Sequence, residues 1–451
     1  ATAFGVAASR STIVPAISCT FARMSKPRIA VLGTGWGGFS FAKRVSKDAF
    51  NVSVVSPRNH FLFTPLLPST TVGTLEFRCI QEPVRTIKGV EYYQAECTDV
   101  NVEAKRLSCR EVFKGNRFDL PYDHLVIATG AVSNTFGVPG VNEENHVHFL
   151  KQLGDARAIR NRILECFERA TSPHLDEEEQ QRLLSFVVVG GGPTSIEFTA
   201  ELYDFVQEDV RRWYPDLRSK VTVTLIEAGD HILGSFNANL IIYTTRLFQN
   251  RNIRLLLQTS VKEVRPQEAL LGDGSAVPFG LMVWSTGLAP TPLVQSLGLE
   301  KQRTRIVVDE HLRVPGHEGV YALGDAAICP ANPLPPLAQV ADQQGKYLAK
   351  VFSELASATA TIATPPFKTT VGLAGPTSTQ QQQPYFPCAT CAAVRVGLAT
   401  LTCERHAPVC VTTGHASPRL LCTPQVSISN KILIPMHWLK SWLFGRDISR
   451  F

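Results

Sequence analysis

Two copies of one local pattern constrain this chain of 451 residues more than any other feature. In each copy, a strand of apolar residues runs into a glycine-rich turn that opens a helix. The first strand, residues 27–32, leads into Gly33, Gly35 and Gly38 in a G-x-G-x-x-G frame. The first glycine of this frame permits a tight turn, the second lets the backbone approach a pyrophosphate, and the third lets helix and strand pack closely. Free N–H groups and the helix dipole bind phosphates, so this segment predicts a dinucleotide site.

The second copy follows the strand 185–189 and has Gly190 and Gly192 in the first two glycine places, with Ser195 in the third. The next predicted strand ends at Glu227. A carboxylate at this point accepts hydrogen bonds from both hydroxyls of an adenosine ribose and repels a 2′-phosphate. The second site is therefore predicted to bind NADH in preference to NADPH. Two such sites in one chain predict two dinucleotides.

Other strand ends supply further candidate binding residues. One predicted strand ends in Thr129-Gly130, and the same pattern returns at residues 286–287. A later strand ends at Asp325, whose carboxylate can accept hydrogen bonds from the ribityl hydroxyls of a flavin. The strand that follows the first glycine turn ends in Ser56 where the generic fingerprint has an acid.

The charge is unevenly distributed along the chain. The formal net charge is +6, yet residues 48–357 contain 30 basic and 37 acidic side chains. Residues 1–47 carry seven basic side chains and no acid, and residues 358–451 carry eight basic and two acidic ones. The bulk of the protein is acidic, so we expect no nucleic-acid partner.

The two ends carry different signals. Residues 1–26 contain Arg, Lys, seven Ser or Thr and no acid, which is typical of a mitochondrial or plastid transit peptide; a tail of no consequence is the alternative. A helix over residues 431–451 is predicted to place five apolar side chains on one side, namely Trp438, Leu439, Trp442, Leu443 and Phe444. Such a face, with Lys and Arg around it, suits the lipid interface, but it could also pack on the protein itself.

The eleven cysteines do not suggest a disulfide framework, because they are spread over the whole length. Cys388 and Cys391 could begin a zinc site, but no second short-spaced pair follows, and we expect no metal.

Four runs carry a family resemblance: Gly33 to Gly38, Ser56 to Pro68, Gly190 to Glu197 and Ala338 to Gly345. The chain resembles the two-dinucleotide flavoprotein reductases and, among these, is similar to the type II NADH dehydrogenases, which are single-chain, non-pumping NADH:quinone oxidoreductases. Residues 443–451 are similar to the ending of the eukaryotic members.

The resemblance implies an α/β fold in which a Rossmann-like FAD domain is interrupted by a Rossmann-like NAD domain, with a C-terminal segment that associates with a membrane. It implies that Gly33, Gly35, Gly38, Thr129, Gly130 and Asp325 serve FAD, and that Gly190, Gly192, Glu197 and Glu227 serve NADH. Glu197 would lie near the nicotinamide. Gln343 and Gln344 would lie near the flavin ring and line the quinone tunnel.

The expected division of the chain is a leader (1–26), the first segment of the FAD domain (27–150), the NADH domain (151–300), the second segment of the FAD domain with the quinone-site helix (301–352), an irregular insert (353–430) and an amphipathic anchor (431–451). The irregular insert could be a lineage-specific addition, a disordered loop or a mistranslated stretch of the gene model.

The implied reaction is hydride transfer from NADH to FAD, followed by two-electron reduction of a membrane quinone, either ubiquinone or plastoquinone. The expected place is the mitochondrial inner membrane, bound peripherally, with the plastid thylakoid as the alternative, and a homodimer is a further expectation. Two other functions stay open: a membrane-associated redox sensor with little quinone turnover, and an NADH-dependent reductase of a soluble electron carrier.

Overall fold

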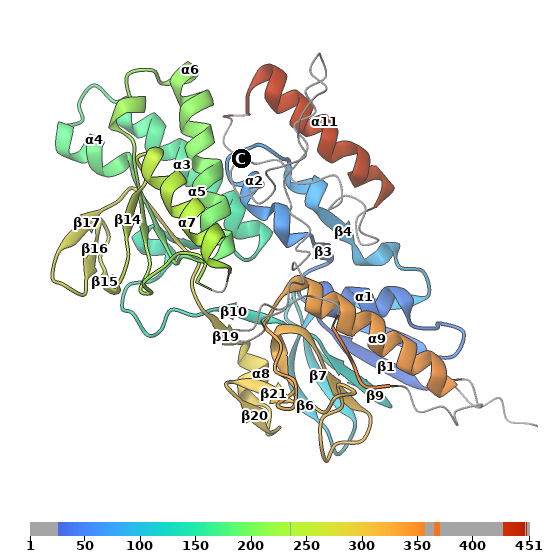
Figure 1. Cartoon of the computed structure of the whole chain (residues 1–451). Coiled ribbons are helices and arrows are strands. Elements are labelled where there is room, and N and C mark those ends of the chain that lie inside the picture. Colours follow the sequence, from blue (N-terminus) through green and yellow to red (C-terminus); the bar gives the residue numbers. More distant parts are fainter. Residues whose placement is uncertain (1–25, 235, 357–364, 370–426, 447, 449–451) are drawn as a thin grey trace, which may run out of the picture.

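The computed structural model describes residues 26–234, 236–356, 365–369, 427–446 and 448. Its framework is a pair of five-stranded parallel sheets, each forming the centre of one dinucleotide-binding domain (Figure 1). The predicted leader apart from Lys26, most of the predicted insert 353–430, and the pair Cys388 and Cys391 lie outside the described residues.

The first sheet has the strand order β22-β9-β1-β2-β5, with every neighbouring pair parallel. Its strands are β1 (Arg28–Leu32), β2 (Asn51–Val55), β5 (Val90–Tyr93), β9 (His124–Ile127) and β22 (Val320–Ala322). Helices α1 (Trp36–Arg44) and α9 (Ala338–Ala356) lie side by side against it (Figure 1). Gly345 permits this close packing, because a Cβ there would collide with the carbonyl oxygen of Gly37.

The second sheet has the order β11-β18-β12-β13-β14, again all parallel. Its strands are β11 (Val147–Phe149), β12 (Ser185–Val189), β13 (Thr222–Ile226), β14 (Arg254–Leu256) and β18 (Leu281–Trp284). Its helices are α3 (Leu153–Ala170), α4 (Glu177–Leu183), α5 (Pro193–Phe205) and α7 (Ala238–Asn250). Every residue of β12 is buried, which explains why its sequence is continuously apolar after Ser185.

The chain crosses between the two domains twice. It leaves the first sheet through β10 (Ala131–Ser133) and returns through β19 (Leu288–Pro290), and these two strands pair in antiparallel fashion (Figure 1). The first domain is thus interrupted by the second, as the family resemblance implies. The second sheet already begins at β11, ahead of residue 151, and β19 carries the chain back before residue 300.

Smaller elements decorate these domains. The remaining strands are β3 (His60–Leu62), β4 (Gln81–Pro83), β6 (Ala95–Asn101), β7 (Arg106–Glu111), β8 (Arg117–Pro121), β15 (Val261–Val264), β16 (Glu268–Leu271), β17 (Ala276–Pro278), β20 (Lys301–Gln302), β21 (Arg305–Val307) and β23 (Ala327–Ile328). The remaining helices are α2 (Leu67–Thr70), α6 (Arg211–Trp213), α8 (Pro292–Ser296) and α11 (Ile428–Phe444), and a π-helical turn, Val206–Val210, continues α5. Short 3-10 turns cover Thr64–Leu66, Phe77–Ile80, Val84–Thr86, Glu143–Asn145, Arg218–Lys220 and Gly324–Ala326.

Helix α11 has one face on the protein and one in solvent. Ile434 is fully buried, whereas Trp442 and Phe444 are 72% and 70% exposed. Trp438 corrects the predicted apolar face: it packs against the core and does not share the exposed side with Leu439 and Trp442. The helix therefore packs on the protein through one side and leaves an apolar side exposed, and its contact with lipid stays a prediction. Within the described residues, no helix is long and apolar enough to cross a membrane.

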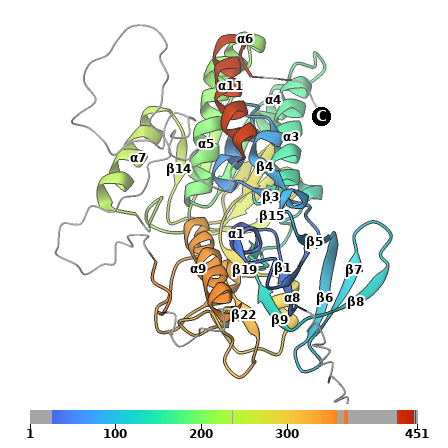
Figure 2. The same ribbon diagram turned by 90° about the vertical axis from the view of Figure 1, so that its right-hand side faces the viewer.

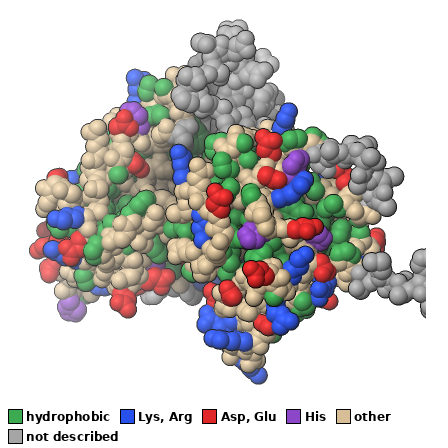
Figure 3. Space-filling view, turned by 90° about the horizontal axis from the view of Figure 1, so that it is seen from below, with side chains coloured by type: hydrophobic (Ala, Val, Ile, Leu, Met, Phe, Trp, Pro, Cys, Tyr) green, Lys and Arg blue, Asp and Glu red, His purple; other side chains and the backbone are tan. Residues whose placement is uncertain are grey.

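Acidic and basic side chains are interspersed on the face shown in Figure 3. This distribution agrees with the mixed charge that the sequence gives the body of the protein.

Candidate active site

The first glycine turn lies at the carboxyl end of β1, between β2 and β9. Gly33 has φ +102°, and a Cβ there would collide with the carbonyl oxygen of Ala128, so the turn requires glycine. A Cβ on Gly38 would likewise meet the carbonyl oxygen of Gly33. At Gly35, in contrast, no atom lies within 4 Å of the Cβ position. Gly33 and Gly38 therefore permit the tight turn, whereas Gly35 leaves open space in front of it. This space fits a pyrophosphate held by backbone N–H groups.

The serine at the end of β2 belongs to the same turn. The Oγ atoms of Ser56 and Thr34 are 3.1 Å apart and buried. Arg58 lies two residues after Ser56, and its Nη1 donates to the Oε1 of Gln152 at 2.7 Å. Burial lowers the pKa of Arg58 to about 10. Where the generic fingerprint has a ribose-binding acid, this chain therefore has a hydroxyl bonded to the turn and a nearby cation.

The other predicted flavin-site residues lie at the same edge of the first sheet. Asp325 lies in the 3-10 turn that follows β22, with the Nζ of Lys151 3.7 Å from its Oδ2. Thr129 and Gly130 follow β9, and the Oγ1 atoms of Thr129 and Thr291 are 3.4 Å apart. Because parallel strands end together, the sheet brings these residues and the first glycine turn to one edge.

The second glycine turn repeats the geometry of the first at the carboxyl end of β12. Gly190 has φ +112°, and a Cβ there would lie 2.6 Å from the carbonyl oxygen of Ser285. The Cβ position of Gly192 has open space around it. Ser195, in the third glycine place, donates its hydroxyl to the same Ser285 carbonyl at 3.2 Å. This hydrogen bond explains why serine is accepted there.

Glu227 lies immediately after β13, beside the second turn. Its carboxylate accepts hydrogen bonds from the backbone N–H of Gly191 and, at 2.6 Å, from that of Gly229. These bonds fix the orientation of the carboxylate next to the open space in front of Gly192. The arrangement fits a ribose whose hydroxyls donate to the remaining lone pairs of Glu227.

Glu197 projects from the first turns of α5, just after the second glycine turn. Its side chain is half-buried, and burial together with the negative charge of Glu201 raises its pKa to about 8. A carboxyl with this pKa holds its proton at neutral pH and can still release it. Such a group is suited to proton transfer.

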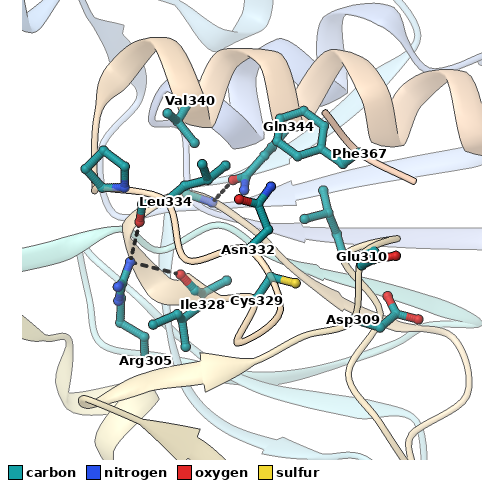
Figure 4. A pocket seen from close by; sticks show the side chains of 14 residues that line it. Arg305, Asp309, Glu310, Ile328, Cys329, Asn332, Leu334, Val340, Gln344 and Phe367 are labelled. Atoms are coloured by element: carbon teal, nitrogen blue, oxygen red, sulfur yellow. Dashed lines mark hydrogen bonds between the residues drawn. The ribbon is translucent and has the colours of Figure 1, made fainter. Parts of the chain in front are cut away.

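Gln343 and Gln344 lie on α9 but point to different neighbours. Gln344 is buried, and its Oε1 accepts from the backbone N–H of Gly324 at 2.7 Å (Figure 4). It thereby holds the turn that carries Asp325. Gln343 accepts a hydrogen bond at 3.2 Å from the Oγ1 of Thr369.

A small hollow under α9 adjoins these residues. It is lined by Arg305, Cys329, Asn332, Gln344 and Phe367, among others (Figure 4). The Nη1 of Arg305 donates to the carbonyl of Leu334 at 3.2 Å, which closes one side of the hollow. The described residues contain no group of His, Cys, Asp or Glu that could hold a metal ion.

A set of buried polar residues next to Glu197 is absent from the sequence-based predictions. Glu201 is 3% exposed, and its carboxylate accepts hydrogen bonds from the hydroxyls of Ser69, at 2.7 Å, and Thr74, at 2.8 Å. A second carboxylate four residues after Glu197 is a signal visible in the sequence. Its hydroxyl partners come from a segment more than 120 residues away, and no local pattern predicts them.

Two glycine turns on parallel sheets, one beside an acid suited to a ribityl chain and the other beside an acid suited to a ribose, define a flavin- and nicotinamide-dependent oxidoreductase. Comparison with known proteins agrees. Residues 27–345 match the family described as pyridine nucleotide-disulphide oxidoreductase.

Relatives of known name narrow the class. A probable NADH dehydrogenase of Dictyostelium discoideum is 40% identical over 433 residues, covering 94% of this chain and 91% of that protein. The mitochondrial internal alternative NAD(P)H-ubiquinone oxidoreductase A1 of Solanum tuberosum is 38% identical over 450 residues, covering 94% and 88%. The solved structure of NDH2 from Plasmodium falciparum in complex with NADH has a TM-score of 0.80 at 26% identity, covering 94% of this chain and 100% of that one.

The chain therefore belongs to the pyridine nucleotide-disulphide oxidoreductases and, within them, to the type II NADH dehydrogenases, as its motifs predict.

Proposed function

We propose that this protein oxidises NADH and reduces a membrane quinone, with FAD as its resident cofactor and without pumping protons. The observation that carries the proposal is the bond between Gln344 and Gly324, which joins the Gln343-Gln344 pair to the turn of Asp325. This bond supports a place for Gln344 beside the proposed flavin site, where an acceptor of electrons has to bind. The names of the relatives, which include ubiquinone oxidoreductases, support the same assignment.

The chain's own residues divide the binding between two sites. The turn of Gly33, Gly35 and Gly38 would hold the FAD pyrophosphate, with Asp325 at the ribityl chain. The turn of Gly190 and Gly192 would hold NADH, with Glu227 at the adenosine ribose. When bound, FAD supplies the redox chemistry, as acceptor of the hydride from NADH and donor of two electrons to the quinone.

Glu197 is assigned to proton handling. Reduction of a quinone to a quinol by two electrons consumes two protons, and a protonated carboxyl can provide one of them. Because its pKa is raised to about 8, Glu197 carries a proton at neutral pH on its carboxyl oxygen. After delivery it can take up another proton from water, since part of the side chain reaches the surface.

Helix α11 is assigned to peripheral contact with the mitochondrial inner membrane. Its solvent-facing side carries six exposed apolar residues, namely Ile432, Met436, Leu439, Trp442, Leu443 and Phe444. A run of apolar side chains that includes Trp suits the headgroup region of a bilayer. Relatives from Solanum tuberosum and Yarrowia lipolytica are described as mitochondrial, which supports this location over the plastid.

The test is NADH oxidation by the purified holoprotein with a short-chain ubiquinone, compared with a soluble ferredoxin and with a disulfide substrate. We expect rapid turnover with the quinone alone. Slow oxidation with every acceptor despite bound FAD would favour the redox-sensor function, and turnover with ferredoxin alone would favour the soluble-carrier function. Sedimentation of the same sample tests the expected homodimer.

A further inference from the structure

The C-terminal helix α11 is tied to both dinucleotide domains by buried carboxylates. At its start, the backbone N–H of Ser427 and the Nδ2 of Asn430 donate to the Oε1 of Glu82, the latter at 3.2 Å. Glu82 lies on β4, which pairs with β3 beside the first domain. Past its end, the backbone N–H of Arg446 donates to the Oδ1 of Asp209 at 2.9 Å. Asp209 belongs to the π-helical turn that continues α5 in the second domain, so α11 spans the two (Figures 1 and 2).

The Arg446 side chain is the firmest of these attachments. Only 8% of it is exposed, and its Nη1 is 2.7 Å from the Oδ2 of Asp209 and 2.8 Å from the Oε2 of Glu208. The Asp209 side chain is 3% exposed. A buried guanidinium has lost its hydration and is tolerated only when its donors are paired. Gly445 makes the approach possible, because a Cβ there would lie 2.9 Å from the Oδ1 of Asp209.

Thr74 connects Arg446 to the interior of the site. Its Oγ1 accepts from the Nε of Arg446 at 2.8 Å and donates to the Oε2 of Glu201 at 2.8 Å. The backbone carbonyl of Thr74 also accepts from the Oγ of Ser441 on α11, at 3.1 Å. A continuous path of hydrogen bonds therefore runs from the end of α11, through a threonine hydroxyl, to the buried carboxylate of Glu201.

Glu201 lies one helical turn after Glu197 on α5, so the two side chains share a face of that helix. Its negative charge acts on Glu197 and adds to the effect of burial. The other charged groups along this part of α5 are Asp204, which is paired with Arg251 at 3.3 Å, and the cluster of Glu208, Asp209 and Arg446. Glu201 is the link between that cluster and Glu197.

We propose that Arg446 is a positioning residue for the quinone reaction, acting through Thr74 and Glu201 on Glu197, so that the site is complete only when α11 is seated. The proposal rests on the function proposed for Glu197. It makes the lipid-facing helix part of the active-site architecture in addition to any role in membrane contact. Loss of Arg446 would let the segment 69–74 and Glu201 relax away from Glu197, so that the negative charge of Glu201 would act on Glu197 more weakly.

The first experiment measures Glu197 directly in the full-length holoprotein by infrared spectroscopy. The carboxyl band of protonated Glu197 is identified as the band that Glu197→Gln removes, and it is titrated in each background. In Arg446→Met we expect the pKa of Glu197 to fall by about one pH unit, a tenfold loss of proton affinity. Arg446→Lys should restore part of the difference.

A matched control is Arg212→Met, because the Nη1 of Arg212 contacts the same end of α11, at the Phe444 carbonyl, but is exposed. This variant should leave the pKa of Glu197 unchanged. Should Arg446→Met fail to fold, Thr74→Val removes only the connecting hydroxyl and is expected to lower the same pKa, whereas Thr74→Ser keeps the hydroxyl and the wild-type value.

A second readout separates positioning from simple loss of structure. The pH profile of kcat with quinone should move down with the pKa of Glu197 in Arg446→Met, while the KM for NADH stays near the wild-type value. An unchanged carboxyl titration in Arg446→Met and Thr74→Val would overturn the proposal. If the wild-type protein reduces no quinone, the proposed function fails, but the infrared titration still decides whether Arg446 acts on Glu197.

Discussion

The substitution Glu197→Gln measures how much a negative charge at position 197 lowers the free energy of unfolding. The wild-type pKa of Glu197 is raised from 4.5 to about 8 in the folded protein. Below about pH 4.5 the carboxyl is protonated in both the folded and the unfolded chain. Between 4.5 and 8 the unfolded chain loses a proton that the folded protein keeps, so the free energy of unfolding decreases as the pH rises. A glutamine cannot ionise, and the variant lacks this decrease.

The size of the effect follows from the pKa. A shift from 4.5 to about 8 corresponds to an upper limit on the order of 5 kcal/mol. Because the side chain is partly exposed and water can enter, we expect about 2 kcal/mol between about pH 5 and about pH 9. The assay is urea unfolding of the holoprotein at both pH values, for wild type and Glu197→Gln. The exposed residue Glu144 provides the control Glu144→Gln, which should behave as wild type. A difference between wild type and Glu197→Gln that is the same at both pH values would refute the reasoning.

Three further predictions concern the binding residues and α11. Glu227→Gln should reduce the ratio of kcat/KM for NADH over NADPH by about tenfold or more, because a charge-assisted ribose contact is worth about 1.5–3 kcal/mol; an unchanged ratio would move the ribose site elsewhere. Gly33→Ala should yield protein with little bound FAD by absorbance, because the new Cβ meets the Ala128 carbonyl at φ +102°; full FAD content would contradict the assigned turn. Replacing Leu439 and Trp442 by Ser should lower the affinity for anionic vesicles, measured by cosedimentation, by about tenfold or more without loss of bound FAD. Equal affinity would place the lipid contact on another surface.

The glycine turns and the sheets around them are predictable from the sequence because their signals are local. A buried strand, three glycines and a helix follow one another within about a dozen residues, and the physical reason for each glycine can be stated in advance. The interruption of one domain by the other is expected only from the family resemblance that these motifs carry. The exact crossings are not, because β10 and β19 are short strands that exist through pairing with each other.

The surroundings of Glu197 could not be predicted in the same way. Glu201, Thr74 and Arg446 are far apart in the chain, and only the tertiary fold brings them together. Trp438 shows the same limit, since the sequence identifies an apolar helix but the neighbouring surface decides which of its side chains are covered. Local motifs thus predict the nucleotide sites, whereas the electrostatics of the proposed catalytic carboxyl depends on long-range packing.

The most direct test of the proposed function follows the two half-reactions separately under anaerobic conditions by flavin absorbance. Stoichiometric NADH should bleach the bound flavin completely, and subsequent addition of a short-chain ubiquinone should restore its absorbance with one quinone consumed per NADH. Bleaching by NADH without recovery on quinone addition would contradict the assignment of the Gln343-Gln344 side as the acceptor site, and a flavin that NADH fails to bleach would contradict the proposed function as a whole.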